Sequence, residues 1–259
     1  MSRYVLALVL LLTLPYCLCA QQPILPGILR PEKAGGGLPA PTLITNSFAY
    51  GQTNSTVTTI AGTWAGSHAT PATGAGIVCG VEGFTSGLTY SVVDNASPTP
   101  DTYTAAGAQH SYNVGSTIYK QNFYYTSISS GITTTTFNLS GAGSGFVVIQ
   151  CLQATGVGGI DTGATGGGNV STDSASGTTW TSSTITTTQP DWIVCHIAAE
   201  GGVGATLTAG TGFTAVGYSS AYNDLIEATV QSVAGAITPT ATLSTSAPAT
   251  GTCTAMEGI

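Results

Sequence analysis

A histidine side chain can act as a general base or as a metal ligand, and this chain has three: His68, His110 and His196. A histidine beside a serine on a sharp turn would serve nucleophilic catalysis, but the G-x-S-x-G pattern that builds such a turn is absent. The nearest string is Gly141-Ala142-Gly143-Ser144-Gly145, in which Ala142 and Phe146 occupy the required glycine positions. No spacing ties a histidine to a serine, and no pair of carboxyl groups is marked for glycosidase chemistry. The sequence therefore predicts that this protein is not an enzyme.

His196 is the histidine whose surroundings come closest to a metal-ligand pattern. Glu200 follows four residues later, and on a strand both side chains share a face with Trp192. Zinc needs at least three protein ligands, and the sequence nominates no third one. A structural histidine that packs inside the fold explains the same spacing, so no transition-metal site is predicted.

Oxygen ligands gather at one turn, where Asp94, Asn95 and Asp101 lie close together in the chain. Calcium prefers carboxylate and carbonyl oxygens, which makes this turn the calcium candidate. Asx turns use the same residue types without any metal. Calcium is thus the one cofactor that the sequence admits, and the alternative is a metal-free turn.

Aromatic residues beside polar strands are the remaining clue to a ligand. Tyr119, Tyr124 and Trp180 stand among Thr-, Asn- and Gln-rich segments, where sugar rings stack on exposed aromatic faces. Strand alternation places Tyr119, Phe123 and Tyr125 on one face and Tyr124 on the other. Phe123 is expected in the core, so Tyr124 is expected to point outward. Tyr119, Tyr124 and Trp180 are the predicted carbohydrate-binding residues, and burial in the core is the alternative for each.

Four cysteines remain after an N-terminal leader is set aside: Cys79, Cys151, Cys195 and Cys253. An even number in an exported chain permits two disulfides, with three connectivities. No two of them are close enough in sequence for a structural zinc cluster. Cys79–Cys253 would join an early and a terminal strand, and Cys151–Cys195 would join the two most apolar strands. These two pairs are the expected disulfides.

The N-terminus indicates export from the cytoplasm. Arg3 precedes an apolar run from Val5 to Leu14, and small residues follow Pro15, as in a secretory signal peptide over residues 1–20. A transmembrane helix needs about 20 apolar residues, so no membrane insertion is expected after cleavage. Residues 21–42 are rich in Pro and Gly and are predicted to form a linker. The protein is expected to be secreted or held at the cell surface.

Charge is scarce, since only 6% of the residues are Asp, Glu, Lys or Arg and a typical soluble domain has roughly 25%. The net charge is −7, with only four Lys and Arg residues in the whole chain. Nucleic-acid binding and binding to anionic membranes need several cations, so both are excluded. Chains with so little charge also associate readily, which makes self-association a second expected interaction.

Short β-type segments recur from about Ile44 to the C-terminus, separated by Gly, Asn, Asp and Pro. Phe146–Leu152 and Trp192–Ala199 are nearly continuous apolar runs, as in central strands, whereas Ile226–Gln231 alternates. Asn223-Asp224 is predicted to form a hairpin turn. No segment has a helical period and no repeat of fixed length is evident. Residues 43–259 are therefore predicted to form one all-β domain, an antiparallel two-sheet sandwich.

One pattern resembles a known family. Ser91 to Asn95, followed by Asp101-Thr102-Tyr103, resembles the strand-turn-strand signature of secreted bacterial sandwich modules, often written VTDNAGNTY. Further matching features follow in the family's order: Tyr124-Tyr125, Phe137 to Gly141, Phe146–Leu152, Thr155-Gly156-Val157, Thr211-Gly212-Phe213 and the strand Thr252 to Ile259. This chain departs from the pattern by inserting Ala96 to Pro100 and by its four cysteines. The resemblance implies a jelly-roll-like sandwich and little about activity.

These observations favour a non-catalytic extracellular module for binding or adhesion, with a polysaccharide or surface glycan as the expected partner. The alternative is a structural subunit that self-assembles into a surface layer or filament.

Overall fold

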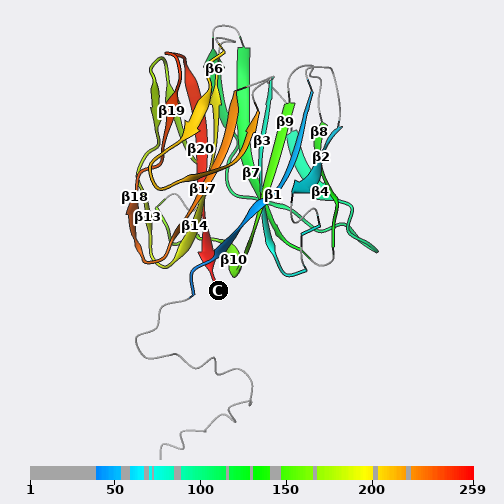
Figure 1. The fold of residues 1–259 in the computed structure, drawn as a ribbon. Coiled ribbons are helices and arrows are strands. Elements are labelled where there is room, and N and C mark those ends of the chain that lie inside the picture. Colours follow the sequence, from blue (N-terminus) through cyan, green and yellow to red (C-terminus); the bar gives the residue numbers. More distant parts are fainter. Residues whose placement is uncertain are drawn as a thin grey trace, which may run out of the picture. The chain divides into compact units, whose positions relative to one another are not determined.

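The computed structural model describes residues 39–53, 59–66, 70–71, 73–84, 89–114, 117–128, 131–140, 147–165, 168–200, 204–219 and 223–259. All of them belong to one compact unit, Gly37–Ile259. The predicted signal peptide and most of the predicted linker lie outside the described residues. Every regular element described is a β-strand, and every pairing is antiparallel, so the predicted all-β sandwich class is confirmed (Figure 1). No helix long and apolar enough to cross a membrane occurs among these ranges.

The largest sheet has nine strands in the order β4-β8-β2-β1-β9-β3-β7-β5, with β6 also pairing β7. The inner strands Gly76–Phe84 and Val147–Thr155 are buried on both faces, whereas Thr59–Gly66 and Thr89–Asp94 alternate buried and more exposed residues as a half-buried surface requires. The strands are β1 (Thr42–Thr53), β2 (Thr59–Gly66), β3 (Gly76–Phe84), β4 (Thr89–Asp94), β5 (Thr104–Ala105), β6 (His110–Val114), β7 (Thr117–Ser127), β8 (Thr134–Ser140) and β9 (Val147–Thr155).

The C-terminal half of the chain forms a six-stranded sheet and two smaller ones. The six-stranded sheet has the order β10-β20-β14-β17-β16, with β11 also on β20; the small sheets are β12-β19-β15 and β13-β18. The strands are β10 (Val157–Ile160), β11 (Val170–Ser174), β12 (Thr179–Thr181), β13 (Ile185–Thr187), β14 (Asp191–Ala199), β15 (Leu207–Ala209), β16 (Thr214–Ser219), β17 (Asp224–Gln231), β18 (Gly235–Ile237), β19 (Thr240–Leu243) and β20 (Ala249–Gly258).

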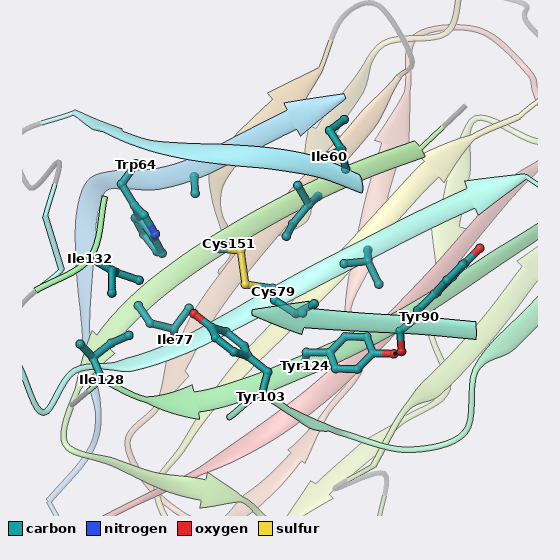
Figure 2. Packing of buried hydrophobic residues seen from close by; sticks show 14 of the residues in the cluster. Ile60, Trp64, Ile77, Cys79, Tyr90, Tyr103, Tyr124, Ile128, Ile132 and Cys151 are labelled. Carbon is teal, nitrogen blue, oxygen red and sulfur yellow. Dashed lines mark hydrogen bonds between the residues drawn. A yellow bond between two sulfur atoms is a disulfide. The ribbon is translucent and has the colours of Figure 1, made fainter. Parts of the chain in front are cut away.

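Three hydrophobic cores hold these sheets together. The nine-stranded sheet curls around the first core, to which β1, β2, β3, β4, β7 and β9 all contribute (Figure 2). Its outer face packs on the six-stranded sheet through the second core, which joins Val78, Phe123 and Leu152 to Trp192 and Ile226 among others. The far face of the six-stranded sheet packs on the small sheets through the third core. The central strands are therefore buried on both faces.

The two halves of the chain repeat one topology. In the first half, β4-β8-β2 leads into β1-β9-β3-β7-β5. In the second half, β15-β19-β12 is the separate three-stranded sheet, and β11-β20-β14-β17-β16 forms the six-stranded one. The strands β4, β8 and β2 correspond to β15, β19 and β12, and β1, β9, β3 and β7 correspond to β11, β20, β14 and β17. Corresponding strands occur in the same chain order in both halves. The fold is thus an internal duplication. The sequence shows no repeat of fixed length because loops of different length separate the matching strands.

The duplication is also visible in the sequence once the strands are aligned. Cys79 and Cys195 each end an Ile-Val-Cys string, and Trp64 precedes Cys79 by the same number of residues as Trp180 precedes Cys195. Both tryptophans are buried, one in each half. Trp64 and Cys79 in the first core are therefore equivalent to Trp180 and Cys195 in the third core.

The disulfides follow the duplication, so the predicted pairing is wrong although the prediction of two disulfides is confirmed. Cys79 bonds Cys151, and Cys195 bonds Cys253. The β3–β9 register places Cys79 opposite Cys151, and the β14–β20 register places Cys195 opposite Cys253. The Cα–Cα distance is 4.0 Å in each pair. Cys79–Cys253 and Cys151–Cys195 do not form because each cysteine already faces its neighbour across a strand pair.

Candidate functional site

Tyr124 points into the first core, so its predicted outward position is wrong. Its side chain is 7% exposed, and its hydroxyl donates to the Tyr90 carbonyl oxygen at 2.8 Å. Phe123 is buried as expected, on the opposite face of β7. The prediction failed because it assumed that only one face of this strand is covered. β7 lies between the first and second cores, and both of its faces are therefore buried.

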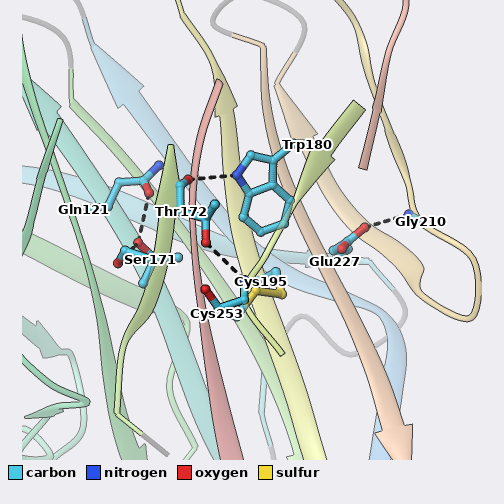
Figure 3. Close-up of a disulfide and its surroundings, with 10 residues drawn as sticks. Gln121, Ser171, Thr172, Trp180, Cys195, Gly210, Glu227 and Cys253 are labelled. Atoms are coloured by element: carbon cyan, nitrogen blue, oxygen red, sulfur yellow. Dashed lines mark hydrogen bonds between the residues drawn. A yellow bond between two sulfur atoms is a disulfide. The ribbon is translucent and has the colours of Figure 1, made fainter. Parts of the chain in front are cut away.

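Trp180 is also unavailable for stacking on a sugar. The indole is fully buried in the third core, and its Nε1 donates to the Thr172 carbonyl oxygen at 2.9 Å (Figure 3). The side chain of Tyr119 lies outside the described residues, as does His68. The predicted aromatic binding face is therefore wrong for Tyr124 and Trp180.

The predicted calcium turn is held by hydrogen bonds to backbone amides. Asp94 Oδ1 accepts from the N–H groups of Ala96 and Asp101, both at 3.0 Å. Asn95 Oδ1 accepts from the N–H groups of Thr133 and Thr134. These are the contacts of Asx-type turns. The contacts of Asp94 and Asn95 thus match the metal-free alternative.

A different cluster forms where the nine-stranded sheet packs on the six-stranded sheet. Glu82 on β3, His196 on β14 and Asp224 on β17 are buried and bring one ligand atom each to within 4.8 Å of the others. His196 Nε2 lies 3.6 Å from Asp224 Oδ1. The sequence spacing placed Glu200 on the same strand face as His196, whereas the strand register brings Glu82 and Asp224 close to the imidazole. Among the described residues, no other such group of His, Cys, Asp or Glu is close enough to hold a metal ion.

Burial dominates the electrostatics of this cluster. Loss of water around the carboxyl group, followed by repulsion from Asp224, raises the pKa of Glu82 to about 8. Burial also raises the pKa of Asp224 well above its ordinary value and lowers that of His196. Without a cation, the three side chains therefore favour their neutral forms. Lys120 is the one Lys or Arg among the described residues, and its Nζ donates to Gln109 Oε1.

Hydrogen bonds orient one member of the cluster. Gln121 Nε2 donates to Glu82 Oε2, while Gln121 Oε1 accepts from the Thr252 hydroxyl at 3.1 Å. Thr252 Oγ1 in turn lies 3.0 Å from Ser171 Oγ. Figure 3 shows Gln121 and Ser171 beside Cys253. These hydrogen bonds connect Glu82 of the nine-stranded sheet to Thr252 and Ser171 of the six-stranded sheet.

The duplication contains the signal that could have located this cluster. Residues one and three positions after each Ile-Val-Cys cysteine face away from the core that holds the disulfide. In the first half these are Gly80 and Glu82, and in the second half the first of them is His196. A Cβ on Gly80 would lie 3.0 Å from His196 Cβ, so the glycine leaves room for the imidazole. Aligning the halves would have placed Glu82 and His196 at the same interface.

Threonines form a second feature, on the outer face of β12-β19-β15. Thr179, Thr242 and Thr208 are directly opposite one another across the three strands, and all are exposed. Thr181 and Thr240 continue the array on one side. On the other side, Ser244 and Thr206 follow and bond each other through Ser244 Oγ. The inward positions carry apolar residues such as Trp180, Ala241 and Leu207. We call the outward set, Thr179, Thr181, Thr206, Thr208, Thr240, Thr242 and Ser244, the threonine face.

The corresponding strands of the first half carry a less regular version of this face. Thr59 and Thr63 of β2 are exposed and lie opposite Asn138 and Thr134 of β8. Ala61 interrupts the row of hydroxyl groups between them. The threonine face of the second half is therefore the more uniform of the two.

Comparison with protein-family models, curated proteins and solved structures finds no match to this chain. The resemblance to secreted bacterial sandwich modules therefore stays a prediction.

Buried carboxyl groups also meet at the start of β14. Asp191 is fully buried and faces Asp161 and Glu257. Burial, followed by repulsion from the carboxyl groups of Asp161 and Glu257, raises the pKa of Asp191 to about 8. Because the folded protein binds this proton more tightly than the unfolded chain does, folding is favoured at lower pH.

The protein is therefore expected to lose stability as the pH rises from about 5 to about 8. Asp191 should contribute up to about 4 kcal/mol to this loss, since the rise covers about three pH units below its raised pKa and each unit is worth about 1.4 kcal/mol. Asp191→Asn should flatten that part of the profile. Urea unfolding of both proteins across this pH range measures the difference, and parallel profiles would contradict the assignment.

Proposed function

We propose that this protein is a non-catalytic extracellular module that adheres to polysaccharide through its threonine face. The observation that carries the proposal is the exposed cross-strand row Thr179, Thr242 and Thr208. The predicted signal peptide supports export, and two disulfides together with the absence of a spanning helix among the described residues are compatible with it.

The geometry of a sheet makes this row part of a grid. Neighbouring strands lie about 4.8 Å apart, and outward residues on one strand repeat about every 7 Å. Each hydroxyl group can donate one hydrogen bond and accept two. A polysaccharide repeats its own hydroxyl groups along the chain, so many donors and acceptors can pair at once.

Repetition matters because each hydrogen bond contributes little on its own. A typical net contribution is about 1 kcal/mol, because water competes for both partners. Adhesion through this face therefore depends on several contacts made together, which a polymer surface offers and a single sugar does not. The threonine methyl groups add apolar contact to the C–H groups of sugar rings.

Adsorption to insoluble cellulose and chitin tests the proposal. The protein should leave the supernatant with at least one of these polymers, and Thr242→Lys should reduce the partition ratio at least about tenfold because it places a charged chain in the centre of the face. Val233→Lys is the matched control, because Val233 is 69% exposed and is no part of the face. Adsorption of Thr242→Lys at the control level, or no adsorption of the parent protein, would contradict the proposal.

Self-association through the same face is the second candidate function. The threonine face has no charged residue, and little charge repulsion opposes contact between copies. Sedimentation velocity distinguishes the two: oligomers of the parent protein that Thr242→Lys dissociates, with no polymer adsorption, would favour the structural subunit.

A further inference from the structure

Glu82, His196 and Asp224 converge from three strands of two different sheets. Glu82 belongs to the nine-stranded sheet, while His196 and Asp224 are on neighbouring strands of the six-stranded one. Their side chains are 1%, 1% and 0% exposed. The side chains thus meet inside the protein, at the place where the two sheets pack together.

Most of the polar atoms in this cluster have no hydrogen bond. Neither ring nitrogen of His196 and neither carboxyl oxygen of Asp224 has a hydrogen-bond partner. Their one mutual contact is the 3.6 Å approach of Nε2 to Oδ1. Buried polar atoms without hydrogen bonds are costly and uncommon, so four of them in one cluster point to a ligand that they share.

The donor atoms suit a divalent transition metal ion. An imidazole nitrogen and two carboxylate oxygens are ligands that zinc accepts, whereas calcium and magnesium take oxygen ligands alone. Ligands about 2.1 Å from a tetrahedral ion lie about 3.4 Å apart. The His196–Asp224 distance is already close to this value, and the longest separation in the cluster, at most 4.8 Å, requires a small contraction.

Charge favours the same occupant. Two ionised carboxylates would carry two negative charges, and a divalent ion would neutralise both. Lys120, the one Lys or Arg among the described residues, bonds Gln109 instead. Gln121 already holds one oxygen of Glu82 in place by a hydrogen bond. Such outer contacts commonly orient metal-binding carboxylates.

We propose that Glu82, His196 and Asp224 bind one zinc ion that ties the nine-stranded sheet to the six-stranded sheet. One position of a tetrahedral site remains for a small ligand such as water. The ion enters during folding, because the site is closed in the folded protein. This site is independent of the threonine face and of polysaccharide adhesion.

Refolding with and without metal tests the site. The protein is unfolded in guanidinium without reductant, refolded with either EDTA or zinc sulfate, desalted and analysed by plasma mass spectrometry. One zinc per chain should remain in the zinc sample, and its unfolding temperature should exceed that of the EDTA sample. Refolding with Co²⁺ should give the visible absorption bands of a tetrahedral site. These three readouts need no variant.

Variants then locate the ion. His196→Gln and Glu82→Gln should weaken zinc binding at least about 100-fold, whereas His110→Gln should bind like the parent. His110 is a matched control because it makes a carboxylate contact with Asp173 near the surface. Absence of retained zinc in the parent protein would overturn the proposal. Equal zinc retention by the parent and the folded His196→Gln variant would overturn it as well, since the ion would then lie elsewhere.

Discussion

Replacing Cys195 and Cys253 together with alanine should lower the free energy of unfolding by about 4 kcal/mol. The bond closes a loop with a sequence separation of 58 residues, and loops of this length restrict the unfolded chain by about that amount. Both cysteines are fully buried in the third core, so the smaller alanine side chains also leave unfilled space. Denaturant unfolding of the variant and the parent measures the difference.

The equivalent pair in the first half provides the control. Cys79 and Cys151 close a loop with a separation of 72 residues, so their double replacement should cost a similar amount. Peptide mapping under non-reducing conditions should recover Cys79 with Cys151 and Cys195 with Cys253. Recovery of Cys79 with Cys253 would show that the strand register is wrong, and a loss below about 1 kcal/mol would contradict the energetic argument.

Trp180→Ala should destabilise the protein by about 3–5 kcal/mol. The indole is fully buried, and removal of a buried tryptophan leaves a large cavity. Gly251 of β20 lies against the ring, where a Cβ would clash, so the strands are shaped around this side chain. The Thr172 carbonyl oxygen would also lose its hydrogen bond.

Trp180→Phe separates these contributions in part, because it removes the Nε1 donor and leaves a smaller cavity than alanine does. It should cost about 1–2 kcal/mol. If Trp180 were an exposed sugar-stacking residue, the alanine variant would unfold at the parent's temperature and lose only binding. That outcome would contradict the buried position in the third core.

Strand content was predictable because it depends on local pattern. The apolar runs Phe146–Leu152 and Trp192–Ala199 predicted central strands, and the structure places β9 and β14 there, buried along both faces. Asn223 adopts a positive φ of 58° just before β17, as the predicted turn requires, whereas Asp224 is already the first residue of that strand. These features require only the side-chain periodicity of a single segment.

Features that depend on pairing between distant segments were not predictable in the same way. The disulfide partners follow from the register of β3 on β9 and of β14 on β20, which no local pattern reveals. The outward position of Tyr124 was inferred by assuming that one face of its strand is exposed. In the structure, one face of β7 packs in the first core and the other in the second core. Glu82, His196 and Asp224 come from three separate segments. The two Ile-Val-Cys strings of the internal duplication are a long-range signal that the sequence does contain.

The threonine face is tested most directly by removing its hydroxyl groups without changing its shape. Thr179, Thr208 and Thr242 are replaced together by valine, which keeps the volume, the charge and the β-branched form of each side chain. All three positions are exposed, so each change should alter the free energy of unfolding by no more than about 0.5 kcal/mol. Adsorption isotherms on the polymer that retains the parent protein are then compared. Affinity at least about tenfold lower, with an unchanged unfolding temperature, is the expected result. An isotherm that coincides with that of the parent would show that polysaccharide adhesion does not use this face.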